Sequence, residues 1–242
     1  MRVGLFVTCL VDLMRPSIGF AAIKLLEAAG CEVVVPETQT CCGQPGFNSG
    51  DRRTAQDLAL KFFDEFDGCD YVVAPSGSCA GMIRVHYPDL FKDQIDVLAR
   101  LTNLTNRTYE LTDFLVTVLK LQAVPGQFTG SITYHDACAG LRELGIKQQP
   151  RELLGKVSGL SLCEMNESAK CCGFGGTFSI KLGEISTRMA ENKCVNIDVS
   201  GADAVVAGDL GCLLNIEGRL RRRGDKKTRV FHVAEVLAGL ID

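Results

Sequence analysis

An internal repeat constrains the fold of this 242-residue chain more than any other feature. The segment TCCGQPG at residues 40–46 returns as KCCGFGG at residues 170–176, an offset of 130 residues. Landmarks that recur in the same order at a nearly constant offset indicate a tandem duplication. Single cysteines stand before and after each copy: Cys9 and Cys79 around the first, Cys138 and Cys212 around the second.

The duplication divides the chain into two expected halves, residues 1–124 and 128–242, with a linker between them. Each half alternates short apolar runs with amphipathic segments, a pattern typical of parallel sheets that helices cover on both faces. We therefore predict an α/β fold of two tandem half-domains, with parallel sheets related by pseudo-two-fold symmetry. The expected strands are 3–8, 32–36, 71–74, 132–135, 160–164 and 204–207; the expected helices are 16–29, 52–66, a segment after Cys138, 182–199 and 213–222.

The repeat also sorts the twelve cysteines into two classes. Eight have a partner in the other half, and they follow strand ends. Because the carboxyl ends of parallel strands meet at one edge of a sheet, we expect the four cysteines of each half to converge there. The paired sets are Cys9, Cys41, Cys42 and Cys79 in the first half, and Cys138, Cys171, Cys172 and Cys212 in the second; the unpaired Cys31, Cys69, Cys163 and Cys194 are expected to be buried small hydrophobes.

Four thiolates suit either structural zinc or an iron–sulfur cluster. Zinc ligands usually come as Cys-x-x-Cys pairs, whereas each half here has two single cysteines and one adjacent pair. Adjacent cysteines point in different directions, which a cluster with several irons accommodates better than one zinc ion. Gly43 and Gly173 allow close backbone approach, so their N–H groups can bond to cluster sulfur. The sequence favours a cluster in each half, with zinc and, for the loop with Gly175 and Gly176, phosphate binding as weaker alternatives.

These motifs resemble those of the CCG cysteine-rich domain proteins, which include a cysteine-rich component of heterodisulfide reductase and iron–sulfur subunits of glycolate oxidase and anaerobic glycerol-3-phosphate dehydrogenase. The chain is most similar to the L-lactate utilization protein A family. The resemblance covers nearly the whole chain. It is carried by the segments RVGLFVTCLVD, PETQTCCGQPGFNSGD, APSGSCAGMI, YHDACAGLRELGI, KCCGFGGTFSIK and GDLGCLLNIEG.

The resemblance implies an iron–sulfur electron-transfer subunit of a complex that oxidises L-lactate to pyruvate. Its eight paired cysteines would hold two [4Fe–4S] clusters. Its implied partners are a ferredoxin-like iron–sulfur protein and a third lactate-utilization subunit. The subunit would belong to an oxidoreductase without being catalytic alone. The alternatives are a subunit of a heterodisulfide reductase-like, glycolate or glycerol-3-phosphate oxidase complex, and a zinc-stabilised scaffold.

Two positions depart from these relatives. The heterodisulfide reductase component has a fifth cysteine where this chain has Met82 and Asn215, so ordinary four-cysteine clusters are expected and disulfide cleavage is not. Met82 is expected to pack in the core. His135, beside the second set, is a candidate for hydrogen bonding or proton transfer, with simple packing as the alternative. Asp136 and Asp209 are candidate helix caps, and His86 and His232 are expected to be structural.

The composition limits other functions. A net charge of −3 without a dominant basic stripe argues against nucleic acid binding. No apolar stretch is long enough to span a bilayer. The apolar segment after Arg2 is interrupted at Asp12 and lacks a cleavage site, so we expect a buried strand rather than a signal peptide, in a cytoplasmic protein.

Overall fold

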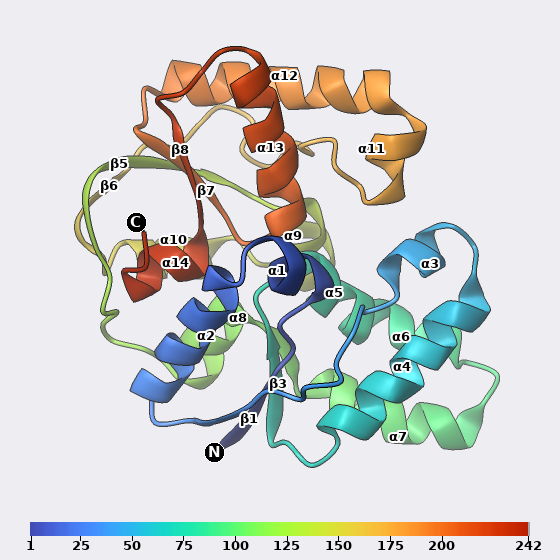
Figure 1. Ribbon diagram of the computed structural model, residues 1–242. Helices are drawn as coiled ribbons and strands as arrows, with labels where there is room; N and C mark the ends of the chain where they lie inside the picture. Colours follow the sequence, from blue (N-terminus) through green and yellow to red (C-terminus); the bar gives the residue numbers. More distant parts are fainter. Residues whose placement is uncertain (242) are drawn as a thin grey trace.

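The computed structural model describes residues 1–241 and contains two parallel four-stranded sheets (Figure 1). The strand orders, β2-β1-β3-β4 and β6-β5-β7-β8, are the same arrangement repeated. The predicted α/β class with two similar parallel halves is confirmed. The strands are β1 (Arg2–Leu5), β2 (Glu32–Val34), β3 (Tyr71–Ala74), β4 (Thr108–Glu110), β5 (Gln127–His135), β6 (Ser158–Leu162), β7 (Ala204–Ala207) and β8 (Arg229–His232).

Helices connect and cover these strands. In the first half they are α1 (Cys9–Met14), α2 (Ser17–Ala28), α3 (Gln44–Asn48), α4 (Arg52–Phe66), α5 (Gly77–Gly81), the π-helix η1 (Met82–His86), α6 (Tyr87–Leu90), α7 (Ile95–Asn106), α8 (Leu111–Asp113) and the π-helix η2 (Phe114–Val118). In the second half they are α9 (Cys138–Leu144), α10 (Gln148–Leu154), α11 (Thr177–Lys181), α12 (Gly183–Ser200), α13 (Leu210–Arg222) and α14 (Val233–Ala238). Across residues 1–241, no helix has both the length and the apolar character needed to cross a membrane.

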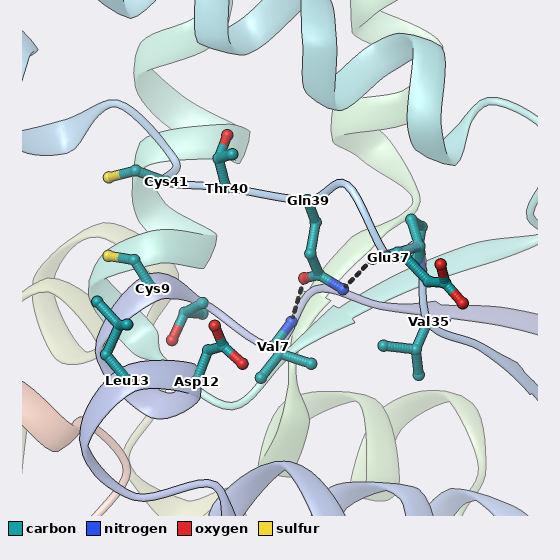
Figure 2. Close-up of a pocket in the computed structure, with 11 residues that line it drawn as sticks. Val7, Cys9, Asp12, Leu13, Val35, Glu37, Gln39, Thr40 and Cys41 are labelled. Carbon is teal, nitrogen blue, oxygen red and sulfur yellow. Dashed lines mark hydrogen bonds between the residues drawn. The ribbon is translucent and has the colours of Figure 1, made fainter.

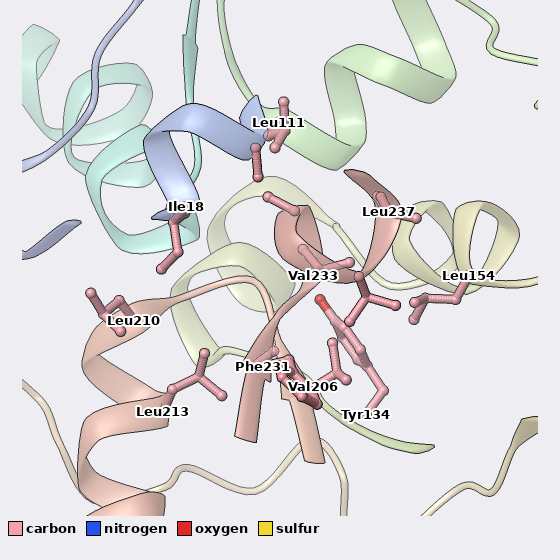
Figure 3. Close-up of a cluster of buried hydrophobic side chains, with 14 of the residues drawn as sticks. Ile18, Leu111, Tyr134, Leu154, Val206, Leu210, Leu213, Phe231, Val233 and Leu237 are labelled. Atoms are coloured by element: carbon pink, nitrogen blue, oxygen red, sulfur yellow. The ribbon is translucent and has the colours of Figure 1, made fainter. Parts of the chain in front are cut away.

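Helices of each half pack against helices of the other half, in equivalent pairs that follow the pseudo-two-fold relation. Helix α14 of the second half packs on α2 of the first, and α8 of the first half packs on α10 of the second. Figure 3 shows the resulting shared core, in which Ile18 and Leu111 lie with Val206, Leu213 and Phe231. Because α5 also packs on α9, the cysteine-bearing edges of the two sheets adjoin. The division at residues 124 and 128 stays a prediction.

The sequence predicted the bounds of the central elements of each half correctly, and it missed elements near the end of each half. Strands β3 and β7 and helix α4 have the predicted bounds. The prediction left out β4, β8 and α7; polar or charged residues at the ends of the two strands, such as Glu110 and His232, interrupt the apolar pattern there. The prediction that Cys163 is buried was wrong. It is partly exposed because it lies just beyond the edge strand β6, and the other three unpaired cysteines are buried.

Glu110 and His232 occupy the same position in the two halves, at the end of the last strand, and each caps the following helix. His232 Nδ1 accepts a hydrogen bond from the N–H of Ala234, so its structural role is confirmed. Glu110 Oε2 accepts from the N–H groups of Thr112 (2.8 Å) and Asp113 (3.1 Å). Burial raises the pKa of Glu110 to about 7. Burial lowers the pKa of His232 to about 3. The stability that Glu110 contributes is therefore lost as the pH rises, and that of His232 is lost as the pH falls.

Replacing Glu110 with glutamine is expected to reduce the pH dependence of stability. Because the pKa of Glu110 rises from 4.5 to about 7 on folding, its contribution is fully present below pH 4.5 and is lost as the pH rises through 7. At about 1.4 kcal/mol per pKa unit, the loss is roughly 3 kcal/mol. Glutamine keeps the acceptor oxygen and has no charge. Urea unfolding of both proteins at about pH 5.5 and 8 measures the effect, and a stability difference that does not change with pH would contradict it.

Candidate metal centres

The four predicted cysteines of the first half line one cavity of about 140 Å³. Cys9 begins α1 directly after the first strand, and Cys79 lies in α5 directly after β3. Between them, the loop after β2 carries the adjacent pair, with Cys41 partly exposed and Cys42 buried. A space of this size is well above the 10–15 Å³ that one water molecule needs. The set that the repeat predicted is therefore brought together around a single enclosed space.

A glutamine holds the loop of the adjacent pair against the end of β1. Gln39 Oε1 accepts a hydrogen bond from the N–H of Val7 at 2.7 Å, and its Nε2 donates to the carbonyls of Leu5 and Pro36. Figure 2 shows this network, with the side chains of Cys41 and Cys9 projecting the same way beyond it. Two segments 32 residues apart are thus fixed side by side, which sets where the two sulfur atoms lie.

The second half repeats this arrangement around a cavity of about 360 Å³. Cys138 begins α9 after β5, and Cys212 lies in the first turn of α13 after β7. Cys171 is partly exposed and Cys172 is buried, as in the first half. All four cysteines line the cavity, so the second predicted set also converges.

The backbone conformation of each loop requires the glycine that follows the cysteine pair. Gly43 and Gly173 have φ values of 83° and 90°, a region that side chains disfavour. Each N–H donates to the sulfur of the first cysteine of the pair at 3.4 Å. A Cβ atom on Gly173 would lie 2.7 Å from the carbonyl oxygen of Ser186, because the loop passes close to α12. These N–H groups therefore donate to cysteine sulfur, and their donation to cluster sulfur stays a prediction.

The thiols of each set are coupled through hydrogen bonds. The pKa of Cys41 is lowered to about 3, chiefly because it accepts hydrogen bonds from the thiols of Cys42 and Cys9. The pKa of Cys171 is lowered to about 2 in the same way, by Cys138 and Cys172. The donor thiols correspondingly have raised pKa values. Each set therefore presents one thiolate and thiols that release protons when a metal replaces them.

The donor set suits a metal or cluster better than an organic ligand. Four sulfur atoms converge in each cavity, and thiolates are the ligands of zinc and iron–sulfur sites. The second site has a further donor. His135 lies with Cys172 and Cys212 so that one ligand atom from each falls within 4.8 Å of the others. His135 is completely buried, and neither of its ring nitrogens has a hydrogen-bond partner within residues 1–241.

Some predictions for residues outside the two cysteine sets are confirmed, and others are wrong. Met82 is fully buried in the core, as predicted, and Asn215 donates to the carbonyl of Cys172 at 2.9 Å. Asp209 caps α13 through the N–H of Gly211, as predicted. Asp136 does not cap a helix, which corrects that expectation, because its carboxylate pairs with Arg151. His86 lines the second cavity, although its sequence position gave no sign of this since no cysteine is nearby.

The two cavities share part of their walls. Phe174, from the cysteine loop of the second half, lines both cavities, and Gln44 from the first-half loop does the same. Asp209 also lines both, and its Oδ2 accepts from the N–H of Ser78 at 3.0 Å, next to Cys79. The packing of α5 on α9 thus brings the two sites into direct proximity.

Comparison with known proteins matches this arrangement to a family. The model of a cysteine-rich domain, CCG, matches residues 3–84 and again residues 132–217. The lactate utilization protein A of Bacillus subtilis is 45% identical over 237 residues, covering 98% of this chain and 99% of the relative. That of Geobacillus kaustophilus is 48% identical, covering 98% of each.

Among solved structures, a hypothetical protein from Helicobacter pylori superposes with a TM-score of 0.68 at 14% identity. The match covers 98% of this chain and 48% of that protein. At this level of identity the likeness concerns the fold alone. It shows that the arrangement of two parallel sheets occurs in a chain of quite different sequence.

Proposed function

Because the chain belongs to the CCG cysteine-rich domain family and to the lactate utilization protein A family, we propose that it is the iron–sulfur electron-transfer subunit of a complex that oxidises L-lactate to pyruvate. One observation carries this proposal above the others: four thiols converge in each of two adjoining cavities at repeat-related positions. The two halves, 1–124 and 128–242, would each carry one [4Fe–4S] cluster.

The ligands would be the eight paired cysteines. When bound, such a cluster takes up and releases one electron at a time. The chain's own residues hold the sulfur atoms in place, donate N–H groups to them from Gly43 and Gly173, and cover them with Phe174. The two sets are Cys9, Cys41, Cys42 and Cys79, and Cys138, Cys171, Cys172 and Cys212.

The number and closeness of the sites fit the chemistry of the substrate class. Oxidation of a 2-hydroxy acid to a 2-oxo acid releases two electrons, and two adjoining one-electron carriers can accept them. The group that removes hydrogen from the substrate would lie in a partner subunit. A ferredoxin-like iron–sulfur protein and a third lactate-utilization subunit are the proposed partners, and a cytoplasmic location would keep the thiols reduced.

Anaerobic purification followed by metal and sulfide analysis tests the proposal. We expect about eight iron atoms and eight acid-labile sulfides per chain, because each [4Fe–4S] cluster contains four of each. The reduced protein should give EPR signals of reduced clusters. Cells without the gene should lose growth on L-lactate and recover it with the intact gene. Stoichiometric zinc without iron would overturn the assignment and favour a zinc-stabilised scaffold.

A further inference from the structure

The two sites differ at one pair of buried positions in the duplicated framework. In the first half, Phe6 directly follows β1 and packs edge-to-face on Phe62 of α4, with ring centroids 5.3 Å apart, in the same core cluster as Cys42 and Cys79. The equivalent positions in the second half are His135, at the end of β5, and Lys193 of α12. Strand pairing sets the first equivalence, because the residues before Phe6 and His135 pair with matching positions of β3 and β7. The loop glycines set the second: a Cβ atom on Gly43 would meet Ala55 and one on Gly173 would meet Ser186, and Phe62 and Lys193 each lie seven residues beyond these contacts. An aromatic pair in one half is therefore an imidazole and an ammonium group in the other.

Lys193 is an unusual lysine because only 2% of its surface is exposed. Its Nζ donates to the carbonyl oxygens of Glu167 (2.6 Å) and Ser168 (3.2 Å), in the turn before the second cysteine loop. Burial lowers the pKa of Lys193, and the nearby Cys172, Asp136 and Cys212 oppose this shift. Fully buried lysines are rare unless a negative group is near them. A negatively charged centre in the adjacent cavity supplies such a group.

His135 adds a donor on the same side. Its ring stands with the sulfur atoms of Cys172 and Cys212, and both of its nitrogens are without hydrogen-bond partners in the described chain. A histidine ring carries at least one N–H in either of its charge states. A buried N–H without an acceptor costs free energy, and a cluster sulfur would satisfy it.

From these contacts we infer that Lys193 and His135 make the second centre the easier of the two to reduce, so that it holds the electron when the chain carries one. The inference rests on the proposed function, since it needs both clusters. Reduction adds one negative charge to a cluster. A buried cation and an N–H donor stabilise that added charge, and the apolar Phe6–Phe62 pair, in the core cluster with Cys42 and Cys79, does not.

Other charges near the sites do not cancel this difference. Asp136 lies beside His135, but Arg151 neutralises it through two hydrogen bonds of 2.7 and 3.0 Å. Asp209 lines both cavities, and its carboxylate accepts hydrogen bonds from the N–H of Ser78 in the first half and of Gly211 in the second. Exposed charges of both signs lie at the mouths, with Asp12 and Glu37 near Cys9, Arg142, Lys170 and Glu167 near Cys171, and Glu143 near Cys138. Those groups are screened by solvent and salt far more than Lys193 is.

Redox titrations followed by EPR on the anaerobically reconstituted full-length chain test this inference. The intact protein should show two potentials. Cys42→Ala, which keeps only the second centre, should retain the higher potential, and Cys172→Ala the lower. Lys193→Met should weaken reduction of the second centre at least tenfold, a shift of about 59 mV to lower potential, and leave the first unchanged. His135→Phe should shift the same centre in the same direction.

Lys156→Met is the matched control, because Lys156 also donates to a main-chain carbonyl, that of Leu121, and lines neither cavity. It should leave both potentials unchanged. A higher potential for the first centre would overturn the inference, as would equal shifts of both centres by Lys193→Met. If Lys193→Met fails to retain its cluster, His135→Phe and the two cysteine variants still decide the order. Failure to bind iron at all would instead refute the proposed function.

Discussion

Substitution of Cys42 with alanine is expected to remove about half of the iron, from about eight to about four atoms per chain. Cys42 is 3% exposed, and its sulfur is hydrogen-bonded to the thiols of Cys41 and Cys79. Among the described residues that line this cavity, the only other cysteines are Cys9, Cys41 and Cys79, which are themselves proposed ligands, so no spare thiol replaces Cys42. The second site should keep its iron, since its four cysteines come from the other half.

The matched control for this change is Cys69→Ala in the same half. Cys69 is also buried, with 4% of its surface exposed, but it lies behind β1 beside Gly4 and lines no cysteine cavity. It should retain all of the iron. Cys172→Ala should have the corresponding effect on the second site and remove the other half of the iron. Iron and sulfide analysis of the anaerobically purified variants measures the outcome, and full iron content in Cys42→Ala would exclude Cys42 as a ligand.

Replacement of Arg151 with methionine is expected to destabilise the chain by about 3–5 kcal/mol, the range for breaking a buried ion pair from one side. The Asp136 side chain is completely buried, and Arg151 donates to both of its carboxylate oxygens. Without Arg151 the carboxylate keeps only the hydroxyl of Ser168, at 2.9 Å. Urea unfolding under anaerobic, reducing conditions measures the loss of free energy.

Two comparisons separate this effect from a simple loss of surface charge. A double variant, Arg151→Met with Asp136→Asn, removes the buried charge as well and should recover most of the lost stability. Arg221→Met breaks an exposed pair with Glu217 and should cost less than about 1 kcal/mol. If Arg151→Met lowers the free energy of unfolding by no more than Arg221→Met does, the buried Asp136 carboxylate does not depend on Arg151 for its stability.

The sequence alone determined the feature on which the candidate site depends, which is the repeat. Because a duplication preserves the order of strands and helices, it sorted Cys9, Cys41, Cys42 and Cys79 from Cys69 and implied a parallel sheet in each half. The convergence of each set followed from a general rule, that consecutive parallel strands end at the same edge. These inferences are local to one half, where spacing along the chain limits distance in space.

Only the tertiary structure decided how the halves meet. The packing of α14 and α8 across the interface depends on the shapes of apolar surfaces, which a periodic pattern does not encode. The packing of α5 on α9 joins the cysteine-bearing edges, so that Phe174 and Asp209 line both cavities, although neither is near the first-half cysteines in sequence. Likewise, the sequence marked His135 as a candidate, but only packing paired it with Lys193, 58 residues away. The repeat and the cysteine spacing predicted which residues make up each candidate site. Side-chain packing between distant segments decided which residues surround them.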